Sequence, residues 1–209
     1  MNPRRRTLLA ALALSPLPAL AQMRRIAAGV DYSELRPQQP VQAGKIEVIE
    51  FFWYGCPSCY KLEPLIEKWA PRLPGDVLFH RIPALLNEQW APDAAAFYTF
   101  EALGVLNRLH RPYFDAIHRD RVNTRSPAAR NDWLQKNGVD VQRFESAYKS
   151  FGVQSKVRRA QQLTVDYRVD GTPAMAVHGR YTISVEQART FEGMLGITDY
   201  LIDAVRKGG

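Results

Sequence analysis

A buried strand that runs directly into a pair of cysteines constrains the fold of this chain more than any other feature. Apolar residues occupy both alternating faces of residues 45–54, which indicates a strand buried on two sides of a parallel or mixed sheet. The motif Cys56-Pro57-Ser58-Cys59 follows, and Pro57 suits the first position of a helix, where its missing N–H is not needed. A helical pattern comes next, and residues 77–82 predict a second strand. Strand, helix and strand over this length form a βαβ unit.

The rest of the chain changes character after this unit. No strand pattern is found between Trp90 and Val169, where helix signals follow one another. Helices are predicted over residues 94–103, 127–137 and 153–169, and a further helix is predicted to begin after a cap at Asp140. Strand character returns at 174–177 and 181–183, and the last predicted helix is most secure over 197–206. The order predicts an α/β domain interrupted by a helical one.

The first twenty-one residues carry the marks of an export signal. Arg4 to Arg6 form a basic segment, residues 8–14 are apolar, and Ala19-Leu20-Ala21 has the small residues of a cleavage site. The apolar stretch is shorter than the about 20 residues that cross a bilayer. We therefore predict that residues 1–21 are a cleaved signal peptide. Arg5-Arg6 also faintly resembles a twin-arginine signal, so the export route stays open.

Cleavage of that segment changes the charge, which bears on the class of partner. The formal net charge falls from +7 to +4, because three arginines and no acids are removed. No stripe of interleaved arginine and aromatic residues is found in the remainder. We therefore expect no nucleic-acid partner.

The cysteine count points to reactivity rather than to a structural bridge. The chain has only two cysteines, and a bridge between Cys56 and Cys59 closes almost no loop, so it contributes little to stability. Cys56 stands at the helix N-terminus, where backbone N–H groups and the helix dipole favour the thiolate. Cys59 lies one turn deeper. We predict that Cys56 is the exposed sulfur that is attacked and that Cys59 is the resolving partner.

Other uses of two cysteines are excluded by what is missing around them. Structural zinc needs four ligands, and neither a second cysteine pair nor histidines at ligand spacing are found. Attachment of c-type haem needs a histidine after the second cysteine, and Tyr60 stands there. We expect no metal and no cofactor beyond the redox-active pair.

Two segments together resemble a known family. Residues 51–60, Phe-Phe-Trp-Tyr-Gly-Cys-Pro-Ser-Cys-Tyr, and the later Gly171-Thr172-Pro173 resemble the DsbA family. The resemblance implies a thioredoxin fold with an inserted all-helical domain. It implies a discontinuous thioredoxin-like domain over 22–85 and 170–209, with the helical insertion over 86–169.

The resemblance also implies a function. Members are periplasmic thiol:disulfide oxidoreductases, so this chain is expected to pass a Cys56–Cys59 disulfide to newly exported cysteine-containing proteins through a mixed disulfide at Cys56. A DsbB-like quinone-linked membrane oxidant is expected to re-oxidise it, and we expect a monomer. Two alternatives stay open: a periplasmic reductase or thiol donor, as in cytochrome c maturation, and a redox-linked chaperone-like binding module.

Thr172 and Pro173 are the predicted substrate-binding residues. In thioredoxin-like proteins a cis proline begins the strand that faces the disulfide, and Pro173 matches it. A cis bond turns the backbone of Thr172 toward the sulfurs, where an extended client can pair with it like an added strand. The alternative is an ordinary turn proline after Gly171.

Glu50 is the third predicted catalytic residue. It shares a strand face with Val48 and Phe52, breaks that apolar pattern, and matches the buried acid of the family. Such a carboxyl beneath Cys59 is placed to accept its proton. The alternative is a strand-end acid that reaches solvent.

Two features of the family pattern remain open in this chain. Glu63 also matches a family acid, but a solvated helix face explains it equally well. Family members often pair the buried acid with a lysine of the next strand, where this chain has His80 or Arg81.

The loop between the cysteines departs from the family. Many members carry histidine where this chain has Ser58, which leaves the strength of the oxidant open. Aromatic side chains near the motif form either a rim for unfolded clients or ordinary core, namely Trp53, Tyr54, Tyr60 and Trp90.

Overall fold

The computed structural model describes residues 25–208, so the predicted signal peptide lies outside the described residues. Within that range the chain forms a five-stranded sheet of order β1-β5-β4-β2-β3. The neighbours β2 and β3 are parallel, and the other pairs are antiparallel. The strands are β1 (Ser33–Glu34), β2 (Ile46–Phe52), β3 (Val77–Pro83), β4 (Ala174–Val177) and β5 (Tyr181–Ser184).

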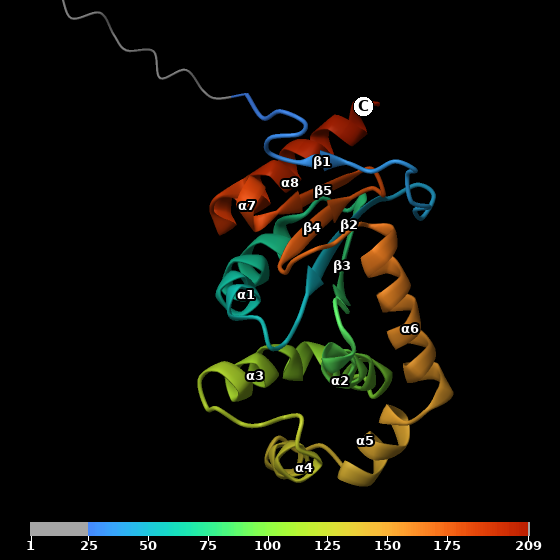
Figure 1. Ribbon diagram of the computed structural model, residues 1–209, viewed down its shortest axis with the longest axis vertical. Coiled ribbons are helices and arrows are strands. Elements are labelled where there is room, and N and C mark those ends of the chain that lie inside the picture. Colours follow the sequence, from blue (N-terminus) through green and yellow to red (C-terminus); the bar gives the residue numbers. More distant parts are fainter. Residues whose placement is uncertain (1–24, 209) are drawn as a thin grey trace, which may run out of the picture.

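Some helices pack against this sheet, and others form a block beyond one end of it (Figure 1). A block of helices separates β3 from β4 in sequence, and Figure 1 shows most of it below the sheet, with α6 running up one side. The helices are α1 (Pro57–Trp69), α2 (Ala91–Ala102), α3 (Leu106–His118), α4 (Pro127–Lys136), α5 (Val141–Tyr148), α6 (Phe151–Asp166), α7 (Val185–Ala188) and α8 (Phe191–Arg206), with short 3-10 helices η1 (Ala70–Arg72) and η2 (Glu88–Trp90).

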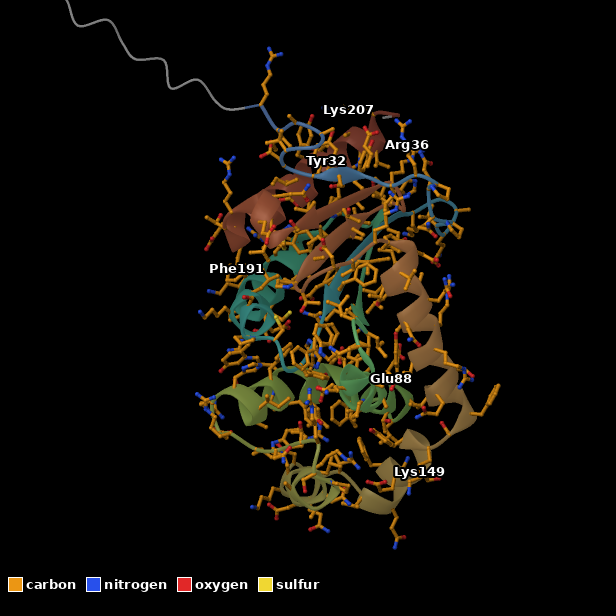
Figure 2. The ribbon with its side chains drawn as sticks, in the orientation of Figure 1. Tyr32, Arg36, Glu88, Lys149, Phe191 and Lys207 are labelled. Atoms are coloured by element: carbon orange, nitrogen blue, oxygen red, sulfur yellow. The ribbon has the colours of Figure 1, made fainter. Side chains whose placement is uncertain are left out.

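The central strand β2 is buried on both faces, as its apolar pattern predicts. Val48 packs in a cluster with residues of α1, β4 and α8, such as Leu62 and Met175. Phe51 points into a second cluster, which includes residues of α2, α3 and α6. The second cluster is the larger of the two and joins the sheet to the helical block. Figure 2 shows side chains filling the space between them.

The predicted order of elements is confirmed, with differences in detail. Helix α3 was not predicted as a separate element, because Pro112 and several charged residues obscure a stripe of buried side chains that includes Leu109 and Phe114. Strand β1 has only two residues, too few for a pattern, and it forms by pairing with β5. Among the described residues, no helix is both long enough and apolar enough to cross a membrane.

Candidate active site

Cys56 occupies the N-cap of α1. Its sulfur accepts a hydrogen bond from the backbone N–H of Cys59 at 3.3 Å. Hydrogen bonding from the Cys59 side chain and from the backbone N–H groups of Cys59 and Ser58 outweighs burial and lowers the pKa of Cys56 to about 6. Pro57 fills the first turn of the helix without a lost hydrogen bond. The helix start thus stabilises a thiolate at this position.

Cys59 lies below Cys56 and behaves differently. It is 0% exposed and Cys56 is 7% exposed, so Cys56 is the more accessible sulfur but is less open than its position in the sequence predicts. Burial raises the pKa of Cys59 well above its ordinary value, and the hydrogen bond and charge of Cys56 add to this effect. Both cysteines are free thiols in this structure.

The loop before β4 meets Cys56. The Thr172–Pro173 peptide bond is cis, as predicted, and β4 begins at the next residue, Ala174. The thiol of Cys56 lies 3.2 Å from the backbone oxygen of Thr172, to which it donates a hydrogen bond. Residues far apart in the sequence are therefore brought together at the Cys56 sulfur.

Glu50 is buried in the middle of β2. It is 1% exposed, so the alternative interpretation, a strand-end acid that reaches solvent, is wrong. Burial raises the pKa of Glu50 to about 8, and the guanidinium of Arg81 opposes that shift. Arg81, its partner in the β2–β3 register, donates from Nε to the carboxylate at 3.0 Å. The strand pairing thus places the positive charge of Arg81 beside Glu50, in the role for which family members often have a lysine.

Glu63 is also buried, so a solvated helix face is the wrong interpretation. It is 2% exposed and accepts a hydrogen bond from Arg81 at 2.7 Å. Burial alone would raise the pKa of Glu63, but the nearby imidazole of His110 and the guanidinium of Arg81 outweigh it and lower the pKa. His80, the other candidate on β3, lies 3.7 Å from Glu47 instead.

His110 completes this buried cluster and was missed by the sequence analysis. It comes from α3, and its Nε2 lies 3.4 Å from Glu63. Its Nδ1 lies 2.8 Å from the hydroxyl of Tyr54. The only sequence signal is a polar side chain on the buried face of α3, which also carries Phe114. A single histidine on such a face does not identify its partners.

The aromatic residues near the motif divide between core and surface. Tyr54 is 0% exposed and belongs to the core, so the interpretation that it forms part of a rim for unfolded clients is wrong. Trp53 is half-buried, stacks on Trp90 with ring centroids 4.2 Å apart, and donates from Nε1 to Asp93 at 2.7 Å. A Cβ atom on Gly55 would overlap the Trp53 ring, so the close approach requires glycine there.

Tyr60 ties the first turn of α1 to the helical block. Its hydroxyl donates to Asp115 at 2.8 Å, and its ring stacks on His118 at 4.8 Å. The Nε2 atom of His118 also lies 2.8 Å from the backbone oxygen of Tyr54, two residues before Cys56. Helix α3 therefore contacts both sides of the cysteine loop.

Comparison with known proteins identifies this arrangement. Residues 47–195 match the family model described as a DSBA-like thioredoxin domain. The chain belongs to this family. It is 41% identical over 201 residues to the thiol:disulfide interchange protein DsbA of Pseudomonas aeruginosa, with 95% of each chain covered. It is 43% identical over 179 residues to DsbA of Azotobacter vinelandii, covering 85% of this chain and 84% of that protein.

Solved structures agree with the sequence relatives. A crystal structure of Pseudomonas aeruginosa DsbA superposes with a TM-score of 0.84 at 41% identity, covering 88% of this chain and 96% of that one. The fold is thus that of the DsbA-like family, a thioredoxin fold with a helical insertion, and the chain is a thiol:disulfide oxidoreductase. Among the described residues, no group of three His, Cys, Asp or Glu side chains is arranged to hold a metal ion.

Proposed function

We propose that the protein acts in the periplasm and oxidises cysteine pairs of newly exported proteins by transferring its Cys56–Cys59 disulfide. The observation that carries this proposal is the contrast between the two thiols. Cys56 is stabilised as a thiolate, with a pKa of about 6, whereas burial keeps Cys59 protonated. Stabilising the dithiol form of such a pair makes the disulfide form a stronger oxidant. This contrast favours an oxidant over a reductase or thiol donor.

The reaction proceeds by two exchanges. A client thiolate attacks the Cys56 sulfur, the Cys56–Cys59 bond breaks, and Cys59 leaves with the electron pair. The client is then linked to Cys56 as a mixed disulfide. A second client thiolate attacks the client sulfur, and Cys56 leaves as a thiolate. The client gains a disulfide and loses two electrons, and the protein is left as the dithiol.

Glu50 supplies the proton that Cys59 needs on leaving. With a pKa raised to about 8 by burial, its carboxyl is mainly protonated at neutral pH. Glu50 and Cys59 are close enough for the charge of one to raise the pKa of the other. Proton transfer from this carboxyl gives the neutral Cys59 thiol that the buried position favours, and the reverse transfer accompanies re-oxidation.

Thr172 and Pro173 are proposed to hold the client. The Thr172 backbone oxygen lies beside Cys56, so an extended client segment can pair with this loop while its cysteine approaches the sulfur. A DsbB-like quinone-linked membrane oxidant is proposed to restore the disulfide. No bound cofactor is needed for either exchange, because the electrons pass through the cysteine pair.

The test uses a reduced, unfolded client that carries two cysteines. The oxidised protein is expected to form the client disulfide stoichiometrically, and Cys56→Ser is expected to abolish the reaction. Cys59→Ala has no disulfide of its own to transfer, so oxidised glutathione is added as the oxidant. Cys56 first forms a mixed disulfide with glutathione and then exchanges it for the client, and these mixed disulfides are expected to accumulate because the resolving thiol is gone. Mass spectrometry of alkylated, quenched samples separates these species. Normal turnover by Cys59→Ala would contradict the assigned roles, and an equilibrium with glutathione that leaves the pair largely disulfide would favour a reductase.

A further inference from the structure

A chain of buried polar side chains leads from helix α3 to the active-site acid. The Tyr54 hydroxyl lies 2.8 Å from Nδ1 of His110, and Nε2 of His110 lies 3.4 Å from Oε2 of Glu63. Glu63 Oε1 accepts from Arg81 at 2.7 Å, and Arg81 donates from Nε to Glu50 at 3.0 Å. Every link except Arg81 is buried. The helical block is thereby connected to the group that exchanges a proton with Cys59.

The orientation of His110 in this chain follows from its surroundings. Burial lowers the pKa of His110, so the ring is neutral, and burial raises the pKa of Tyr54 well above its ordinary value, so the phenol keeps its hydrogen. The single ring hydrogen is assigned to Nε2, because a lone pair there would face the Glu63 carboxylate oxygen at 3.4 Å; Nδ1 then accepts from the Tyr54 hydroxyl at 2.8 Å. Nε2 of His110 lies 3.4 Å from Oε2 of Glu63, and neither of these two buried atoms has another hydrogen-bond partner among the described residues, so the N–H and the carboxylate oxygen face one another. The tautomer therefore presents a donor to the carboxylate.

The guanidinium of Arg81 donates hydrogen bonds to two buried carboxyls, those of Glu50 and Glu63. Arg81 balances a single negative charge, and two carboxylates in one buried site cannot both ionise freely, so one of them keeps a proton. The two carboxyls do not have equal partners, because only Glu63 also faces the N–H of His110. A donor hydrogen bond to one carboxyl of such a pair stabilises that carboxyl in the charged form. The proton is then left on the other carboxyl, Glu50.

We propose that His110 is a positioning residue: by facing Glu63 with its Nε2–H, it fixes Glu63 as the charged partner of Arg81 and leaves Glu50 as the carboxyl that holds and exchanges the proton. This inference rests on the proposed function only in one respect, namely that the proton on Glu50 is exchanged with Cys59. The division of the proton between the two carboxyls is a property of the folded protein and is measurable without a client.

Other charged groups face the same cluster. Cys56 and Cys59 of α1 act on Glu50, and Arg111, the neighbour of His110 on α3, acts on the imidazole. Arg111 opposes protonation of His110 and so supports its neutral form. A cavity of about 450 Å³ is lined by Glu63, Arg81 and His110 but by neither cysteine. The cavity therefore borders the Glu63 end of the cluster rather than the sulfurs.

The decisive variant is His110→Phe, which keeps a ring of similar shape and removes the donor. We expect the titration midpoint of Glu50 to fall from about 8 by about one pH unit, a tenfold change in its proton equilibrium, and that of Glu63 to rise. Side-chain carboxyl NMR of glutamate-labelled, reduced protein reports both midpoints, with assignments from Glu50→Gln and Glu63→Gln. An unchanged Glu50 midpoint in His110→Phe overturns the proposal.

Two controls separate the hydrogen bond from packing. His110→Gln retains an amide donor and is expected to keep the Glu50 midpoint within a few tenths of a unit. Phe114→Leu removes ring contacts to His110, with centroids 5.3 Å apart, but no hydrogen bond, and is expected to lower stability without moving the midpoint. Equal shifts in all three variants overturn the proposal.

A further variant covers the case in which His110→Phe does not fold. Tyr54→Phe releases Nδ1 and lets the ring change tautomer, so the Glu50 midpoint is expected to move in the same direction by a smaller amount. If Tyr54→Phe leaves the midpoint unchanged, the proposal is wrong. Client oxidation by the unmodified protein is measured alongside. Its absence contradicts the proposed function while leaving the carboxyl titrations to decide the role of His110.

Discussion

Stabilisation of the Cys56 thiolate makes the stability of the reduced protein depend on pH in a defined direction. The pKa of Cys56 is lowered to about 6 in the folded protein, mainly by hydrogen bonding from Cys59, whereas a free thiol in an unfolded chain titrates near about 8.5. A lowered folded-state pKa adds stability that is fully present above the unfolded value and is lost as the pH falls through the folded value. The window therefore runs from about pH 8.5 down to about pH 5.

The magnitude follows from these two values. Linkage with pKa values of about 6 and about 8.5 gives about 1.4 kcal/mol at pH 7 and about 3 kcal/mol at pH 8.5. Cys56 is the more accessible of the two sulfurs, so solvent screening reduces charge effects there. We therefore expect about 1 kcal/mol at pH 7 and about 2 kcal/mol at pH 8.5.

The comparison is between the reduced protein and Cys56→Ser, which cannot ionise but has nearly the same shape. Guanidinium unfolding under a phosphine reductant, repeated from pH 5 to pH 8.5, gives the difference in the free energy of unfolding. Because Glu50 and all other groups are common to both proteins, most of their pH dependence cancels in the difference. The difference is expected to grow in favour of the unmodified protein as the pH rises. A difference that stays flat across this range would refute thiolate stabilisation at Cys56.

Three further substitutions test other parts of the site. Ser58→His is expected to lower the pKa of Cys56 further and to make the protein more oxidising, by about 30 mV for each tenfold change in the exchange constant, as measured by thiolate absorbance and glutathione equilibrium. Pro173→Ala is expected to slow release of a mixed-disulfide client, because this residue follows the backbone oxygen that contacts Cys56; stopped-flow quenching with mass detection would show it, and unchanged release would argue against a binding role. Arg81→Met leaves two buried carboxyls without their cation and is expected to cost about 3–5 kcal/mol of unfolding free energy at pH 7, measured by denaturant unfolding. The loss should shrink toward pH 4 as the carboxyls are protonated, and a pH-independent loss would contradict the charge argument.

The sequence predicted the parts of the site that are local. Strand β2, the cysteine motif and the start of α1 are consecutive, so their periodicity and helix-start residues were sufficient. Burial of Glu50 was also predictable, because it interrupts an apolar strand face.

The parts that could not be predicted depend on contacts between distant elements. Glu63 lies on a helix whose exposed and buried faces both carry polar residues, and its burial is set by Arg81 from β3 and His110 from α3. Tyr54 resembles a rim residue in sequence because it stands near the cysteines. It is core because helix α3 covers it, and that helix was not predicted separately.

The strand order has a consequence for how the protein itself is made. Strand β2 pairs on one side with β3, close behind it in the chain, but on the other side with β4, where Val48 is the partner of Val177. The chain is synthesised from its N-terminus, so β2, α1 and β3 can associate early. One edge of β2 stays unpaired until the helical block and then β4 have been synthesised. Thr172 belongs to the same late segment, so Cys56 lacks its neighbouring backbone during that interval. The cysteine pair therefore lies beside an unpaired strand edge until the C-terminal residues complete the sheet.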